Sequence, residues 1–200
     1  MKDSLRKSIN WSLGIAVITL VLAAIFSIIS TAILSGVTWA AGMAIVLLIV
    51  LMGIFFDIIG VAATAANEVP FHAMASERVK GAKQSILVTR NADKVASFCN
   101  DVIGDISGIV SGTAAAAVVV ELARQLGQSD NGVFQFVIAV TFTSIVAALT
   151  VGGKAFGKSL AIQYSTEIIF QVGRFIYVIE NKLKINLFTK KRKRSKRNGK

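Results

Sequence analysis

The sequence predicts an all-α integral membrane protein with about four transmembrane helices and two amphipathic helices beside them. Hydrophobic residues make up 54% of the 200 residues, and the mean hydropathy is +0.67. Charged residues make up only 16%, compared with about 25% in a typical soluble domain. A span needs about 20 apolar residues, so the chain has room for about four spans and for no second sizeable domain.

The first apolar run extends from Trp11 to about Leu34, after a short basic N-terminus. The apolar region of a cleavable signal sequence is only about 7–15 residues long. This run is longer, and another span follows it directly. We therefore interpret residues 1–36 as an uncleaved signal-anchor segment.

The second apolar run extends from Trp39, an aromatic residue suited to the membrane interface, to about Ala65. We expect it to end at Asn67-Glu68-Val69-Pro70, because the residue before a proline avoids helical geometry. From Pro70 to Val88, apolar residues recur at helical spacing and charged residues occupy the other side. This pattern predicts one amphipathic helix at the membrane surface or against the bundle.

The third and fourth apolar runs extend from about Phe98 to Leu122 and from about Val133 to Val151. Gly152-Gly153 predicts a break after the fourth span. We expect a second amphipathic helix from Phe156 to about Leu187. The remaining residues, 188–200, are rich in lysine and arginine and are expected to form a disordered basic tail.

The distribution of basic residues predicts the orientation of the chain. Both termini are basic, and the segment between the second and third spans carries Arg78, Lys80, Lys83, Arg90 and Lys94. The two other loops hold only Arg124. The positive-inside rule therefore predicts that both termini and this segment lie in the cytoplasm. The expected location is the plasma membrane, as a multi-pass protein.

The net charge of +11 does not indicate a nucleic-acid-binding protein, because the excess is concentrated at the C-terminus. Ten basic residues and no acidic ones lie between Lys182 and Lys200, with few aromatic residues to stack on bases. A basic tail next to a membrane segment is typical of binding to anionic lipid. The expected partners are therefore the lipid bilayer and, at the tail, anionic lipid.

No catalytic motif is present. Cys99 and His72 are the only cysteine and histidine, so neither an intrachain disulfide nor a set of catalytic histidines can form. A phosphate-binding glycine loop is also absent, and we predict that the chain is not an enzyme.

Acidic residues within the spans are the candidate functional groups, because ionisable residues at membrane depth are costly. On the second span, the face of Asp57 also holds Gly53, Gly60, Thr64 and Asn67. On the third span, Asp101 and Asp105 share a face with Gly104, Gly108 and Gly112. We expect this glycine face to pack closely on another helix. The opposite face is expected to meet lipid; it holds Val102, Ile103, Ile106, Ile109 and Val110.

Oxygen ligands from two helices suit a hard cation such as Mg²⁺. The predicted ligands are Asp57, Asn100, Asp101 and Asp105. In the alternative interpretation, the carboxylates on the third span stay hydrated near the cytoplasmic interface or pair with a lysine. The candidate lysines are Lys94, Lys154 and Lys158.

The order of these elements resembles the transmembrane domain of the cyclin-M/CorC family of magnesium transporters, over residues Val37–Ile185. Phe55-Phe56-Asp57 resembles the end of the family's first core helix, and Arg78–Ser97 resembles its cytoplasmic helical hairpin. Ile103-Gly104-Asp105 resembles an Ile-Gly-Asn element. Residues 153–161 resemble a Gly-Glu-x-x-Pro-Lys-x-x-Ala motif that precedes a juxtamembrane helix.

The resemblance implies that residues 37–187 form a magnesium-transporter-like domain that assembles as a homodimer. This sequence departs from the family at three positions. Lys154 stands where the family motif has an acid, Gly157 stands where it has a proline, and the acid expected after the first core helix falls near Gly60. The regulatory cytoplasmic domains of the family have no counterpart in these 200 residues, which predicts a divergent member.

Two functions follow from this comparison. One is a Mg²⁺ transporter-like protein, with a degenerate ion site if Lys154 enters it. The other is a non-transporting membrane component that binds a protein partner or anionic lipid.

Overall fold

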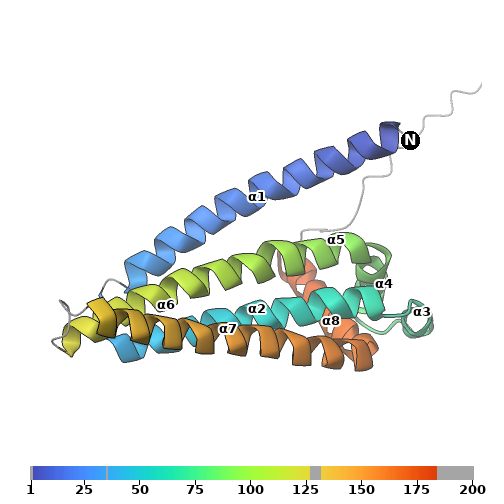
Figure 1. Cartoon of the computed structure of the whole chain (residues 1–200). Coiled ribbons are helices and arrows are strands. Elements are labelled where there is room, and N and C mark those ends of the chain that lie inside the picture. Colours follow the sequence, from blue (N-terminus) through green and yellow to red (C-terminus); the bar gives the residue numbers. More distant parts are fainter. Residues whose placement is uncertain (1, 35, 127–131, 184–200) are drawn as a thin grey trace, which may run out of the picture.

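The computed structural model describes residues 2–34, 36–126 and 132–183, and these residues are helical almost throughout (Figure 1). Four segments are long and apolar enough to cross a membrane, which confirms the predicted all-α membrane class. They are Trp11–Leu34, Trp39–Ala65, Ala92–Gln125 and Gln135–Gln163. The predicted basic tail, residues 188–200, lies outside the described residues.

The first span belongs to α1 (Lys2–Leu34), and the second span is α2 (Trp39–Ala65). The third span joins α5 (Ala92–Ala96), a π-helix η1 (Ser97–Gly104) and α6 (Asp105–Gln125) into one continuous rod. The fourth span belongs to α7 (Gly132–Gln163).

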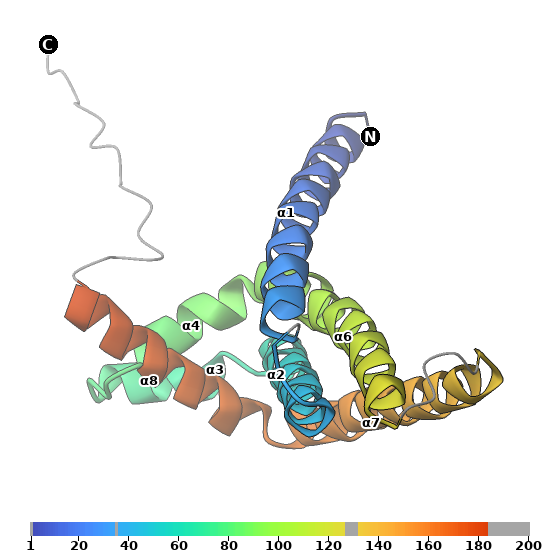
Figure 2. The ribbon, with the colours of Figure 1, turned by 90° about the vertical axis from the view of Figure 1, so that its left-hand side faces the viewer.

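Helix α2 occupies the centre of the bundle and packs against η1, α6 and α7 (Figure 2). Glycines allow these helices to approach one another closely. A Cβ on Gly53 would lie 2.8 Å from Ser107 Cβ of α6, and a Cβ on Gly157 of α7 would lie 2.8 Å from Ile58 Cγ1. Asp57, on the same face of α2 as Gly53, is therefore held against its neighbours.

The predicted faces of the third span are wrong in part. Gly104 is buried next to α2, but a Cβ on Gly108 or Gly112 would meet no heavy atom within 4 Å, so these two glycines make no close contact with another helix among the described residues. The supposed lipid face is instead partly covered: Val102, Ile106 and Val110 are buried against Ile15, Leu22 and Ala23 of α1 and against Ile49. The physical reason is the first span, which packs on α6 and shields this apolar stripe from lipid.

The predicted break at Gly152-Gly153 is also wrong, since α7 continues without interruption to Gln163. Gly153 packs against Ile54 of α2, so this glycine serves helix contact. Within a membrane an interrupted helix would expose backbone groups that lipid cannot satisfy. As a consequence, Phe156 belongs to α7, and the second amphipathic helix is α8 (Ser165–Leu183), which begins after Tyr164.

The single amphipathic helix predicted over Pro70–Val88 is two helices, α3 (Val69–Ser76) and α4 (Ala82–Arg90). Between them Arg78 has φ 59° and Gly81 has φ 95°, a left-handed conformation that glycine adopts without steric cost. A Cβ on Gly81 would lie 2.8 Å from Arg174 Cα of α8. The turn is thus required by the close packing of α4 on α8.

An ion pair ties the start of α3 to the end of α4. Arg90 Nε donates to Glu68 Oε1 at 2.6 Å, and His72 Nε2 lies 3.3 Å from Glu68 Oε2. The hydrogen bond from Arg90 is the main reason why the pKa of the Glu68 carboxyl lies below its ordinary value. These short helices, together with α8 and the N-terminal end of α1, gather toward one end of the bundle (Figure 1).

A matched pair of substitutions tests the packing of α1 on α6. Ile106 is 3% exposed and Ile109, three residues later, is 59% exposed. We expect Ile106→Ala to lower the free energy of unfolding by about 2 kcal/mol. This is the lower end of the range measured in the cores of soluble proteins, because an apolar side chain that leaves a membrane bundle enters lipid and not water. Ile109→Ala should change it by less than about 0.5 kcal/mol. Unfolding of both variants in mixed micelles measures the difference, and equal losses would contradict the packing of α1 on this face.

Candidate functional site

The carboxylate of Asp57 lies inside the bundle, between α2 and η1. The residue is 4% exposed, and its Oδ2 is buried without a hydrogen-bond partner. Its Oδ1 lies 3.9 Å from the position that a Cβ on Gly104 would occupy. Gly104 of η1 therefore lies next to the carboxylate, at an ordinary van der Waals distance.

Asn100 lies one turn earlier in η1, over Gly60 of α2. A Cβ on Gly60 would overlap the Asn100 amide, so this glycine makes room for it. Asn100 Oδ1 is also buried without a partner. Asp57 and Asn100 thus place two unsatisfied oxygen acceptors in the same interface between α2 and η1.

The π-helical geometry of Ser97–Gly104 belongs to this site. A π-helix widens the helical turn, and such segments occur frequently at functional sites. Both Asn100 and Gly104, the residues of η1 nearest to α2's polar face, lie within it. No periodic pattern in the sequence indicates this change of helix type, which is why the sequence predicts a regular α-helix for the whole third span.

Lys154 reaches the site from α7. Its Nζ lies 3.4 Å from the Gly104 carbonyl oxygen, to which it donates, and 3.8 Å from Asp105 Oδ1. It also lies 3.6 Å from the Cβ position of Gly104, the same point that lies 3.9 Å from Asp57 Oδ1. The ammonium is therefore paired with Asp105, while Asp57 approaches the same point of η1 without forming an ion pair with Lys154; the lysine side chain is only 22% exposed.

The four predicted Mg²⁺ ligands do not all converge. Asp57 and Asn100 lie in the interface between α2 and η1. Asp105 lies outside this interface, with its side chain 67% exposed, and is connected to it only by its ion pair with Lys154. Asp101 is exposed. Among the described residues, no group of three or more His, Cys, Asp and Glu side chains is arranged to hold a metal ion.

The cation in this site is the ammonium group of Lys154, which lies next to the oxygen atoms of Gly104 and Asp105. An ammonium group offers three hydrogen-bond donors and no acceptor, and Lys154 directs it at the Gly104 carbonyl oxygen and at Asp105 Oδ1. A Mg²⁺ ion at about 4 Å from this ammonium would be repelled by roughly 4 kcal/mol for each unit of its charge at an effective dielectric of 20. The arrangement therefore favours an internal ion pair over a bound divalent cation.

The sequence does not predict the roles of two groups in the site. The Gly104 carbonyl oxygen accepts from Lys154, and Gly60 creates the space for Asn100. Gly60 could have been identified from its spacing, because it shares one face of α2 with Gly53 and Asp57. The carbonyl of Gly104 has no such signal, because backbone acceptors become available only through local geometry.

Comparison of the chain with protein-family models, with curated proteins and with solved structures finds no match. Its function is therefore inferred from its own residues.

Proposed function

We propose that this chain is a magnesium-transporter-like membrane protein of the cyclin-M/CorC type whose ion site is degenerate, because the ammonium of Lys154 takes the place of the divalent cation. The single observation that carries the proposal is the position of Lys154 Nζ, 3.4 Å from the Gly104 carbonyl oxygen and 3.8 Å from Asp105 Oδ1. The order of the sequence elements supports the choice of family.

The charges in and around the site support a closed ion site. Asp57 and Asp105 supply two negative charges, and Lys154 supplies one positive charge. A divalent cation would have to displace the ammonium from its acceptors or tolerate it as a neighbour. Mg²⁺ also requires nearly ideal octahedral geometry at about 2.0–2.1 Å from its ligands, and Asp101 does not contribute a ligand here.

The proposed protein spans the plasma membrane with both termini in the cytoplasm. The N-terminal end of α1 and the helices α3, α4 and α8 gather at the same end of the bundle (Figure 1). That end carries the basic residues between the second and third spans, so the positive-inside rule assigns it to the cytoplasm.

Cysteine labelling tests this orientation. In a Cys99→Ala background, a cysteine at Ser129 or Asn131, between the third and fourth spans, should react with a membrane-impermeant maleimide added to intact cells. A cysteine at Ser76 or Ser195 should react only after the cells are opened. Labelling at Ser76 from outside would contradict the four-span arrangement.

Thermal unfolding with Mg²⁺ tests the closed site. Millimolar Mg²⁺ should leave the Tm of the purified protein unchanged, whereas Lys154→Glu should restore Mg²⁺-dependent stabilisation. When Mg²⁺ exceeds its Kd tenfold, the gain is about 1.4 kcal/mol, or roughly 3–6 °C. The matched control is Lys158→Glu, which makes the same charge change at an exposed position one turn along α7.

The controls for this experiment are Ca²⁺ and matched ionic strength. Mg²⁺-specific stabilisation of the unmodified protein, lost in Asp105→Asn, would contradict the proposal and support an active transporter site. Equal responses of Lys154→Glu and Lys158→Glu would show that Mg²⁺ senses net charge and not this site.

A further inference from the structure

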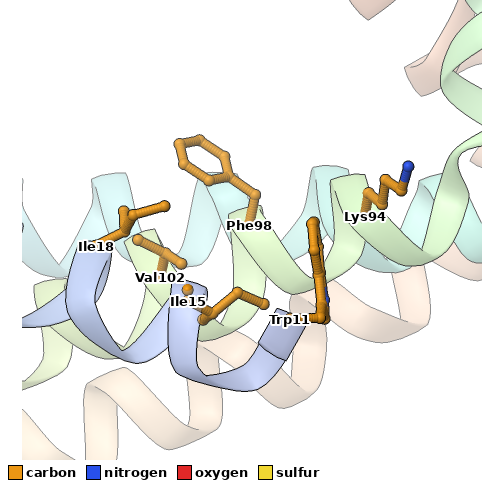
Figure 3. A pocket seen from close by; sticks show the side chains of 7 residues that line it. Trp11, Ile15, Ile18, Lys94, Phe98 and Val102 are labelled. Atoms are coloured by element: carbon orange, nitrogen blue, oxygen red, sulfur yellow. The ribbon is translucent and has the colours of Figure 1, made fainter. Parts of the chain in front are cut away.

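An apolar crevice separates α1 from the start of the third span, away from the polar site. Its walls are Gly14, Ile15 and Ile18 of α1 and Phe98 and Val102 of η1 (Figure 3). The two helices diverge toward the N-terminal end of α1 (Figure 1), and the side chains between them leave a cavity of about 160 Å³.

One end of the crevice carries a cation and an interfacial aromatic residue. Lys94 Nζ lies 5.9 Å from the centroid of the Trp11 ring, and both residues line the crevice. Trp11 begins the first span, the position at which tryptophan marks the boundary between lipid and water. Within residues 2–34, 36–126 and 132–183, Lys94 forms no ion pair with a carboxylate.

This combination has the shape and chemistry of a phospholipid site. A cavity of about 150 Å³ accepts an apolar molecule of the size of benzene, so this crevice holds a segment of one hydrocarbon chain and not a whole lipid. The crevice lies between two membrane-spanning helices, where acyl chains are the available apolar ligand. The exposed ammonium of Lys94 at its interfacial end selects for a headgroup with net negative charge.

We propose that the crevice between α1 and η1 binds one anionic phospholipid, with its phosphate at Lys94 and Trp11 and one acyl chain against Ile15 and Val102. Lys154 does not line this crevice, so the lipid site does not depend on the proposed degenerate ion site. It gives the first span a second role beyond covering α6.

Trp11 supplies the measurement. The chain has two tryptophans, so Trp39→Phe leaves Trp11 as the only one. Phosphatidylglycerol with brominated acyl chains should quench Trp11 fluorescence saturably in mixed micelles, at about fivefold lower mole fraction than brominated phosphatidylcholine. This factor is the contribution of one basic residue near anionic lipid.

Two matched pairs of variants locate the lipid. Lys94→Met should remove the fivefold preference for phosphatidylglycerol, whereas Lys83→Met, an exposed lysine on α4, should keep it. Gly14→Leu should abolish saturable quenching by filling the crevice, since a Cβ on Gly14 meets no atom within 4 Å. Ala16→Leu, an exposed position on α1 that does not line the crevice, should leave quenching unchanged. The tail is identical in all variants, so its contribution cancels.

Three results would overturn the proposal: equal quenching by the two brominated lipids, equal effects of Lys94→Met and Lys83→Met, or saturable quenching that survives Gly14→Leu. Ile18→Phe, which enlarges a side chain already in the crevice, is a second filling variant. It replaces Gly14→Leu, with the same expected loss of saturable quenching, if Gly14→Leu does not elute as a folded, monodisperse protein.

Discussion

The buried carboxylate of Asp57 sets the main constraint on this bundle. A charge between membrane-spanning helices costs several kcal/mol unless it is paired or hydrogen-bonded, and Asp57 is 4% exposed. Asp57 Oδ2 has no hydrogen-bond partner, so the neighbouring elements place polar groups near the carboxylate without pairing it directly. Gly60 makes room for the Asn100 amide, and Lys154 of α7 donates to the carbonyl oxygen of Gly104, which lies beside Asp57. Gly60, at the contact of α2 with η1, is therefore the glycine that makes room for a polar side chain, whereas Gly53 and Gly157 allow the close contacts of α2 with α6 and α7.

Much of the fold could be predicted from the sequence, because lipid imposes a simple rule on composition and length. The bounds of the first two spans, Trp11–Leu34 and Trp39–Ala65, agree with the structure. Gly53, Asp57 and Gly60, which the helical period places on one face of α2, are buried, whereas Thr64 and Asn67 of the same face are exposed. These features can be predicted because they depend only on the length of an apolar run and on the spacing of residues along a single helix. The amphipathic segments were less predictable: the turn at Gly81 depends on the approach of α8, which no local pattern encodes.

The errors have a common physical origin in contacts between distant segments. Ile106 lies on an apolar stripe that would face lipid in an isolated third span, but α1 covers it in the bundle. Gly153 belongs to a glycine pair typical of a helix break, but its contact with Ile54 of α2 gives it a packing role. For the site, the types of residue were predictable but their convergence was not: the π-helix places Asn100 and Gly104 against α2, while Asp101 is left exposed. The first span thus shapes the outer surface of the bundle, where the crevice at Trp11 opens, without taking part in the polar site.

If the ammonium of Lys154 takes the place of a divalent cation, its charge should be energetically coupled to the buried carboxylate of Asp57, and a double-mutant cycle measures this coupling directly. Lys154→Met and Asp57→Asn are compared, singly and together, by the free energy of unfolding in mixed micelles. Lys154→Met should be destabilising, Asp57→Asn in the same chain should recover part of the loss, and the coupling should be about 0.5–3 kcal/mol. The same cycle with Lys158→Met, on the exposed side of α7, should be additive. Additivity of Lys154→Met and Asp57→Asn within about 0.5 kcal/mol would contradict the account.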